Sequence, residues 1–424
     1  MDWQIWFAGI LFLIVYAIII TEKIHRTVIA LFGATLLLVL GIVTQHEAVT
    51  KYIDFNTIGL LFGMMVIVAI TRKSGVFEYA AIKAAHSTGG DPVKTMMALA
   101  TVTAVASAFL DNVTTVLLVV PVTISICKVL DINPVPIFVA EILASNIGGT
   151  ATLIGDPPNI MIGSATGLGF MDFVTNLTPV IIVVFIVTIF LLKLIYKKKL
   201  HTTPENKAKL MAMNPSDAIE DMPLLKKSMT VVALVILGFI MHQTLGLESA
   251  AIALFGASLL MLITREAPEE VLLSVEWDVL FFFIGLFILV GGLEKTGIIE
   301  GMARKAVSLT QGNLTLSTML ILWFSAIASA FIDNIPFVAT FIPLIKEMGQ
   351  IGHMNVMPLW WALSLGACLG GNGTIIGASA NVIVSGIAAR EGHPMGFINY
   401  MKVAFPLMLI SIVICMFYLL IFYV

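Results

Sequence analysis

The sequence predicts an all-α polytopic membrane protein made of two inverted repeats, each with five transmembrane spans (one broken) and a re-entrant helical hairpin. Its composition, its long apolar runs and an internal duplication support this fold class. Of 424 residues, 59% are hydrophobic and 12% are charged, and the mean hydropathy is +1.03. Soluble domains carry about 25% charged residues. The composition therefore excludes a soluble enzyme, a nucleic-acid-binding protein and a disordered scaffold.

The cysteines and the N-terminus add little chemistry. Cys127, Cys368 and Cys415 lie in apolar contexts without the spacing of a zinc site or a disulfide framework. The first residues lack the basic region of a signal peptide, so we expect the first apolar run to be retained. We expect no cofactor and no nucleic-acid partner.

Membrane spans are recognised by length, since a spanning helix needs about 20 mostly apolar residues. Uncomplicated candidates are 3–20, 27–44, 56–71, 174–196, 229–246, 250–264, 278–294 and 402–423. Two longer regions, 136–170 and 358–389, are interrupted at their centres by glycine, threonine and asparagine. Each is predicted to be a span whose helix is broken, with unwound backbone satisfied by protein or by a watery cavity.

Residues 94–130 and 314–348 have a different pattern, with two apolar arms around a central Asp-Asn. Each arm of about 16 residues would form ~24 Å of helix, short of the ~30 Å hydrocarbon core. We therefore predict re-entrant hairpins with Asp-Asn at their tips. The shorter amphipathic segments 74–88 and 296–311 are expected to lie along the interface.

A shift of 222 positions brings the two halves of the chain into register. Residues 107–112 (Ser-Ala-Phe-Leu-Asp-Asn) fall on 329–334 (Ser-Ala-Phe-Ile-Asp-Asn), and the glycines, threonines and asparagines of the two breaks also match. Five spans are an odd number, so the second repeat is predicted to be inverted. The predicted boundaries are 1–196 for the first repeat, 197–228 for a linker and 229–424 for the second repeat.

The distribution of basic residues predicts the orientation. With both termini outside and the linker 197–228 in the cytoplasm, 18 of the 23 lysines and arginines fall on the cytoplasmic side, Arg26 among them. The positive-inside rule favours this arrangement over its mirror image. We expect a multi-pass protein of the cell membrane, either a bacterial inner membrane or a plasma membrane.

The motifs at the tips and breaks resemble those of the ion transporter superfamily, which includes arsenite permeases, one class of sodium/proton antiporters, di- and tricarboxylate (citrate) transporters and the melanosomal P protein. Residues 107–115, 154–159 and 369–374 look most like the P-protein and arsenite-permease branch. The resemblance implies a homodimer with a scaffold part and a transport part. Carboxylate-transporting relatives carry Ser-Asn-Thr at the tips, whereas this chain has Asp111-Asn112-Val113 and Asp333-Asn334-Ile335.

Two carboxyl groups at membrane depth are the main candidates for chemistry, because an ionised carboxylate there costs several kcal/mol, ~2.5–3.5 on insertion scales. At the hairpin tips, Asp111 and Asp333 could each hold a proton or bind Na⁺ together with carbonyl and amide oxygens. They could also simply cap the helices that follow them, since aspartate is a favoured N-cap. Both roles are compatible.

Other polar residues at the tips and breaks could line the same site or serve only close helix packing. The candidate ion- and substrate-binding set is Asp111, Asn112, Thr114, Asn146, Gly149, Thr150, Thr152, Asp156, Asn159, Asp333, Asn334, Gly371, Asn372, Thr374, Ser379 and Asn381. Ser107 and Ser329 are expected to support the tips. Glu141 could relay protons, and Cys368 could meet a soft metalloid or act only as a packing thiol.

These residues favour a secondary active transporter with a site at the membrane midplane between the repeats. No arginine or lysine falls in a predicted span or at a tip, so proton-coupled antiport of a small cation (Na⁺/H⁺ type) is the leading hypothesis, with H⁺ or Na⁺ as coupling ion and no metal beyond a transported Na⁺. Proton-coupled arsenite or antimonite efflux comes next, then anion or carboxylate symport. An intramembrane aspartyl protease and a channel rank lower.

The expected partners are the lipid bilayer, a small inorganic ion or metalloid, and a second copy of the chain. The sequence lacks the phosphate-binding motif of nucleotide hydrolases. An arsenite pump driven by ATP would therefore need a separate ATPase subunit.

Overall fold

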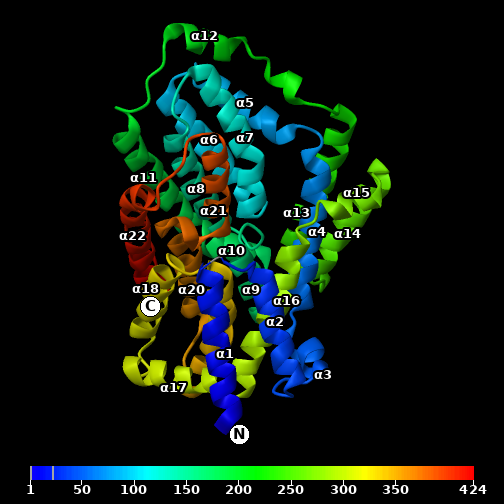
Figure 1. The fold of residues 1–424 in the computed structure, drawn as a ribbon, viewed down its shortest axis with the longest axis vertical. Helices are drawn as coiled ribbons and strands as arrows, with labels where there is room; N and C mark the ends of the chain where they lie inside the picture. Colours follow the sequence, from blue (N-terminus) through cyan, green and yellow to red (C-terminus); the bar gives the residue numbers. More distant parts are fainter. Residues whose placement is uncertain (1, 22) are drawn as a thin grey trace.

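The computed structural model of the chain describes residues 2–21 and 23–424, and within these ranges it contains helices and no strands. Figure 1 shows the elements. In chain order they are α1 (Asp2–Thr21), α2 (Arg26–Val39), α3 (Gln45–Glu47), η1 (Ala48–Tyr52), α4 (Phe55–Arg72), α5 (Val76–Ser87), α6 (Pro92–Ser107), α7 (Asn112–Leu130), α8 (Val135–Thr150), α9 (Pro157–Thr166), α10 (Phe170–Asn176), α11 (Thr178–Tyr196), α12 (Pro204–Ala212), η2 (Pro215–Ala218), α13 (Met222–Leu245), α14 (Ser249–Thr264), α15 (Pro268–Leu273), α16 (Trp277–Lys295), α17 (Ile298–Thr310), α18 (Leu314–Ser329), α19 (Asn334–Gly352), α20 (Met357–Gly370), η3 (Gly371–Gly373), η4 (Ile375–Gly377), α21 (Ser379–Arg390) and α22 (Phe397–Phe422).

The all-helical membrane fold predicted from the sequence is confirmed. Among the described residues, seven helices are long and apolar enough to cross a bilayer: α1, α4, α7, α11, α13, α16 and α22. Three shorter apolar helices, α2, α8 and α14, accompany them. Many of their large apolar side chains are exposed on the outside of the bundle, as expected where lipid is the solvent.

The two regions with a central Asp-Asn form pairs of helices joined by a short turn. The first pair is α6 and α7, and the second is α18 and α19. Each first arm ends at a serine, Ser107 or Ser329, and each second arm begins at the asparagine of the motif. The amphipathic helix α17 meets α18 at an angle of 120°. The predicted turns at Asp-Asn are therefore present, but the second arms, α7 and α19, have 19 residues rather than about 16, and α7 is long enough to cross a bilayer.

Both predicted breaks are present at mid-segment. The helix of the first broken span stops at Thr150 and resumes as α9 at Pro157. The second stops at Gly370, passes through two short 3₁₀ turns and resumes as α21 at Ser379. Glycines within the breaks remove the side chains that would otherwise hold the backbone apart.

Several predicted boundaries differ from the structure, and three of the differences are informative. The span expected at 27–44 ends as a helix at Val39, because Gly41 turns the chain with a positive φ of 68°. The span expected at 174–196 is divided at Leu177, next to Thr178-Pro179, where proline fits only the start of a new helix. Helix α13 begins at Met222, inside the segment expected to be a linker.

The most extensive helix contacts occur in pairs that the duplication relates. Helix α2 packs on α16 as α14 packs on α4, and α6 packs on α8 as α18 packs on α20. We call α2, α4, α14 and α16 the first helical body, and the hairpins with the broken helices the second helical body. Figure 1 shows α5 at the end of the molecule that carries the linker helix α12, and α17 at the opposite end with the N-terminus. Inverted repeats predict this placement, but the orientation relative to a bilayer stays a prediction.

Candidate functional site

Asp111 and Asp333 both act as N-caps at the hairpin tips. A carboxylate oxygen of Asp111 accepts the backbone N–H of Thr114 at 2.8 Å, and one of Asp333 accepts that of Ile335 at 3.1 Å. The capping role considered from the sequence is therefore real. It uses one oxygen of each carboxyl group and leaves the other for a different partner.

The second oxygen of each aspartate has a different partner in the two hairpins. At the first tip, the hydroxyl of Thr114 donates to Asp111 at 2.5 Å. The duplication places Pro336 at the position of Thr114, and proline has neither a hydroxyl nor a backbone N–H. The second oxygen of Asp333 instead accepts hydrogen bonds from Arg26 at 2.8 Å and Ser379 at 3.0 Å.

Serine and threonine side chains attach each tip to the neighbouring broken helix. The hydroxyl of Ser107 donates to the carbonyl of Ser145 at 2.7 Å, and Ser329 donates to the equivalent carbonyl of Ala367 at 2.6 Å. Thr152 donates to the carbonyl of Ala108 at 2.5 Å, and Thr374 makes the equivalent bond to Ala330. All four hydroxyls therefore bond the tips to the broken helices.

Equivalent asparagines stabilise the unwound backbone of the two breaks. The Asn159 amide donates to the carbonyls of Thr150 and Thr152 at 3.2 and 2.8 Å. The Asn381 amide donates to those of Gly371 and Thr374 at 2.7 and 2.9 Å. Because unpaired carbonyls are costly at membrane depth, each asparagine replaces hydrogen bonds that the broken helix has lost.

Glycines allow the breaks to approach the hairpins. A Cβ built on Gly149 would lie 2.5 Å from the carbonyl oxygen of Gly155 and 3.3 Å from the Ser107 hydroxyl. One on Gly371 would lie 3.0 Å from the carbonyl oxygen of Gly377. The predicted site residues Gly149 and Gly371 thus serve close packing of backbone on backbone.

The first tip and the two broken helices meet through a network of amides. The Asn146 side chain donates to the side-chain oxygens of Asn372 at 2.9 Å and Asn381 at 3.0 Å, and accepts from Asn112 at 3.0 Å. The hydroxyl of Thr150 remains local and donates to the carbonyl of Asn146 at 2.6 Å. The asparagines are at most 4% exposed, so this junction lies at the centre of the molecule.

Asp156 joins the first break to the second hairpin. Its carboxylate oxygens lie 3.3 and 3.4 Å from the amide nitrogen of Asn334, and the side chain is completely buried. The Cys368 thiol lies beside the same carboxyl group. The equivalent of Asp156 in the second repeat is Ala378, so the junction is asymmetric.

The expectation that no basic side chain reaches a hairpin tip is wrong. Arg26 forms an ion pair with Asp333, and its side chain is only 23% exposed. It cannot be counted among the basic residues of the cytoplasmic surface. The helix α2 is short and starts beside the tip, which the apolar run 27–44 does not reveal. A basic residue in the first turn of a helix, where the dipole favours acids, was the one local signal.

Sequence reasoning also missed several neighbours of the junction. Ser364 donates its hydroxyl to the Asn159 side chain at 2.5 Å, and the Tyr400 hydroxyl donates to the carbonyl of Asn372 at 3.1 Å. Both come from predominantly apolar helices, α20 and α22.

Glu141 lies apart from the tips. It is completely buried between α8 and α7, one carboxylate oxygen accepts the Thr123 hydroxyl, and the other has no hydrogen-bond partner among the described residues. A role in proton relay stays a prediction.

Two cavities related by the duplication flank the junction. One of about 310 Å³ is lined by residues that include Ile24, His25, Arg26, Asp278 and Asp333. The other, of about 280 Å³, contains their equivalents, which are Leu247 for Ile24, Glu248 for His25, Ser249 for Arg26 and Asn56 for Asp278. Asp333 reaches only the first cavity, and Asp111 does not line its counterpart.

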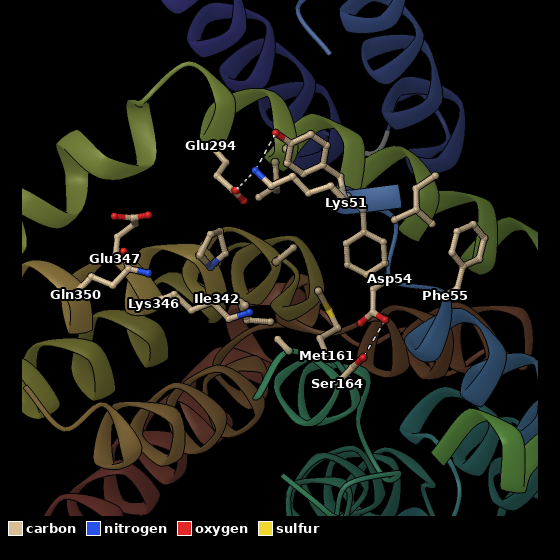
Figure 2. A pocket seen from close by; sticks show the side chains of 18 residues that line it. Lys51, Asp54, Phe55, Met161, Ser164, Glu294, Ile342, Lys346, Glu347 and Gln350 are labelled. Carbon is tan, nitrogen blue, oxygen red and sulfur yellow. Dashed lines mark hydrogen bonds and ion pairs between the residues drawn. The ribbon is translucent and has the colours of Figure 1, made fainter. Parts of the chain in front are cut away.

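A third cavity, of about 510 Å³, separates the two helical bodies (Figure 2). On one side, Lys51 forms an ion pair with Glu294 at 2.8 Å. On the other side lie Lys346 and Glu347 of α19. Among residues 2–21 and 23–424, no group of three or more His, Cys, Asp or Glu is placed to hold a metal ion.

Hairpins and broken helices that meet at a buried polar junction define a membrane transporter. Residues 16–366 match the CitMHS family, described as citrate transporter. The chain belongs to this family, within the superfamily that its motifs resemble.

Relatives cover nearly the whole chain. An uncharacterized transporter of Mycobacterium tuberculosis is 44% identical over 414 residues, which are 96% of each chain. The human P protein is 34% identical over 493 residues, covering 97% of this chain and 59% of that protein.

Two solved structures share the fold at low sequence identity. The YdaH transporter of Alcanivorax borkumensis aligns with a TM-score of 0.60 and 14% identity, covering 93% of this chain and 98% of that one. MtrF of Neisseria gonorrhoeae, described within a class of antimetabolite efflux pumps, has a TM-score of 0.60 and 12% identity, covering 92% and 84%.

Proposed function

We propose that this transporter is a secondary active antiporter that exchanges a small cation, such as Na⁺, for protons at the junction of the tips and breaks. The buried carboxyl group of Asp156 carries the proposal. Its contacts with Asn334 are long, and the ion pairs found among the described residues include neither Asp156 nor Asp111. A carboxylate in such a place needs a proton or a cation.

The charge at the junction supports a cation as cargo. Three carboxyl groups, those of Asp111, Asp156 and Asp333, lie at the tips and at the first break, and one guanidinium group, that of Arg26, pairs with Asp333. Even with Arg26 paired to Asp333, two acidic groups remain. Side-chain oxygens of Asn372 and Asn381 and the carbonyls of the breaks add the hard ligands that Na⁺ prefers.

The proposed movement follows from which contacts cross between repeats. The bond from Asn334 to Asp156 links a tip of one repeat to a break of the other. Binding of a proton or of Na⁺ to the Asp156 carboxyl group weakens it as a hydrogen-bond acceptor for Asn334. Binding of the cargo is therefore coupled to the position of the second hairpin tip. The cavity in Figure 2 lies between α16 and α19, and the proposed entry of cargo uses this cavity.

Carboxylate transport is a second candidate, because a specific observation favours it. Arg26 places a guanidinium group in a cavity of about 310 Å³ beside the second tip, and guanidinium suits carboxylate recognition. The family description as citrate transporter points the same way. Arsenite or antimonite efflux would use Cys368, whose thiol lies 3.7 Å from the Asn159 oxygen. A homodimer, and an ATPase subunit for a pump, stay predictions.

Reconstitution in proteoliposomes tests the proposal. With an imposed pH gradient, added Na⁺ or Li⁺ is expected to collapse the gradient, and Asp156→Asn is expected to lose this response while inserting normally. Citrate uptake without any response to Na⁺ would establish the carboxylate candidate instead. Arsenite accumulation in everted vesicles, again without a Na⁺ response, would establish metalloid efflux.

A further inference from the structure

We propose that Arg26 is a tethered cation that occupies Asp333 when the transported cation is absent and leaves it when that cation or a proton binds. This inference rests on the proposed function and adds a residue that competes with the cargo. It starts from the position of Arg26 at the first turn of α2. A positive side chain at a helix N-terminus opposes the helix dipole. Its location therefore reflects the contacts that it makes outside the helix.

The contacts of Arg26 join the two helical bodies. One terminal nitrogen of the guanidinium, Nη1, donates to Asp333 at 2.8 Å and to the Ser379 hydroxyl at 2.6 Å. The guanidinium carbon lies 5.1 Å from the centre of the Phe282 ring on α16. Arg26 and Phe282 belong to the packed pair α2 and α16, whereas Asp333 and Ser379 belong to the second hairpin and the second broken helix. The ion pair thus clamps one body to the other.

The environment of the pair allows a solute cation to compete. The side chains of Arg26 and Asp333 are 23% and 14% exposed and line the cavity of about 310 Å³. The other charged and titratable groups near this pair are His25, directly before Arg26, Asp278 and Glu276 at the start of α16, Asp156 of the first break and Tyr16 of α1. A pair that is reached by water can exchange its partner without moving a bare charge through protein.

The chemistry of guanidinium suits a permanent substitute for the cargo. Arginine stays protonated at all relevant pH values, so it cannot itself carry the exchanged proton. It neutralises Asp333 only by contact. When Na⁺ or H⁺ binds Asp333, the carboxyl group is already neutralised and the ion pair with Arg26 is lost. The helix α2 and the second hairpin are then no longer joined by this ion pair.

The first hairpin provides an internal comparison. There the position equivalent to Arg26 is Ser249, and the second oxygen of Asp111 is taken by the Thr114 hydroxyl. At the second tip, Pro336 replaces that threonine and leaves the oxygen of Asp333 open to Arg26. The repeats thus differ at two independent positions, and both differences favour a cationic side chain of the protein at Asp333 and not at Asp111.

The test measures the concentration of Na⁺ that gives half-maximal exchange in proteoliposomes. Arg26→Gln removes the competitor, so half-saturation is expected to fall by about 3- to 10-fold, the scale of a partly exposed ion pair. Arg26→Lys keeps a cation and is expected to stay near the wild-type value. Arg304→Gln removes an exposed ion pair with Glu300 on α17 and is the matched control, with no change expected.

A second variant tests the tether with Arg26 in place. Pro336→Thr supplies the hydroxyl found at the first tip, which competes with Arg26 for Asp333, and is expected to lower half-saturation in the same direction. If Arg26→Gln does not fold, Pro336→Thr decides alone. Unchanged half-saturation in the variants that fold overturns the tether. A rise in Arg26→Gln also overturns it, because Arg26 would then help to bind the cargo. A wild-type protein without any cation response overturns the proposed function, and the tether with it.

Discussion

The amide of Asn334, at the tip of the second hairpin, donates to both carboxylate oxygens of Asp156 in the first break, at 3.3 and 3.4 Å. These two residues are 178 positions apart and belong to different repeats. Because of this contact, the position of the second hairpin tip depends on whether the Asp156 carboxyl group in the other repeat is charged. Loading at Asp156 and movement of the second hairpin are therefore linked through one amide.

Replacing Asp156 should abolish coupled exchange without unfolding the protein. Asp156→Asn keeps the shape of the side chain and removes the exchangeable charge, so the coupled rate is expected to fall by about 100-fold or more, the usual effect of losing a proton-transfer group. Asp217→Asn in the exposed linker is the control. Normal Na⁺-driven proton flux in Asp156→Asn would contradict the assignment.

The role of each tip aspartate can be distinguished experimentally from the role of the side chain that bonds to its second carboxylate oxygen. Asp111→Asn and Asp333→Asn are each expected to stop coupled transport in proteoliposomes, since each carboxyl group is part of the junction. Thr114→Val removes only the hydroxyl that donates to Asp111 at 2.5 Å. It is expected to retain transport with an altered cation affinity. Wild-type exchange rates in both Asp→Asn variants would refute a role of the tips in ion binding.

Close packing of hairpin on broken helix predicts a steric effect at two equivalent glycines. A Cβ on Gly148 would lie 2.1 Å from the carbonyl oxygen of Ala104, and one on Gly370 would lie 2.5 Å from that of Ala326. Gly148→Ala and Gly370→Ala are expected to destabilise the protein by about 1–3 kcal/mol, the usual cost of overpacking. Thermal unfolding in detergent measures the change.

Gly301 in α17 is the matched control for these glycines. No atom lies within 4 Å of a Cβ placed there, so alanine adds helix propensity without a clash. Gly301→Ala should leave the melting temperature unchanged or raise it. Equal loss of stability in all three variants would show that the close backbone contacts are unimportant.

One ion pair at the end of α16 predicts a pH-dependent contribution to stability. Lys295 bonds to Glu47 at 2.6 Å, and this contact, with the capping bonds of Thr44, lowers the pKa of Glu47 to about 2. A lowered pKa means that the contribution is complete above the ordinary value of 4.5 and is lost as the pH falls toward 2. Lys295→Met should therefore reduce the melting temperature at pH 7 but not near pH 2.

Lys305→Met is the control for this pH profile. Lys305 is exposed on α17 and makes none of the ion pairs found in the described part of the chain. Its replacement should not alter the difference between pH 7 and low pH. A Lys295→Met effect that is constant from pH 7 to pH 2 would contradict the ionic origin.

Much of the junction could be predicted from sequence because its residues act locally. Asn159 and Asn381 bond to carbonyls 7 to 10 positions away within their own breaks, which the spacing of the motif already indicates. The serines and threonines that hold the tips recur at one shift in both repeats. Arg26 differs, because its partner Asp333 lies 307 positions away and the equivalent residue in the other repeat is Ser249. Neither the hydrophobic periodicity nor the internal duplication predicts the contact between Arg26 and Asp333.

By itself, the amino-acid sequence determined the membrane as solvent, the two hairpins, the two broken helices and the polar residues at their centres. Hydropathy and helix breaks report on solvent and on hydrogen bonds between near neighbours, which any fold of this chain must satisfy. Only the tertiary structure decided that Asn334 reaches Asp156 and that Arg26 reaches Asp333. The choice of a charged partner depends on how two packed bodies are placed against each other, and that placement is a property of the whole chain.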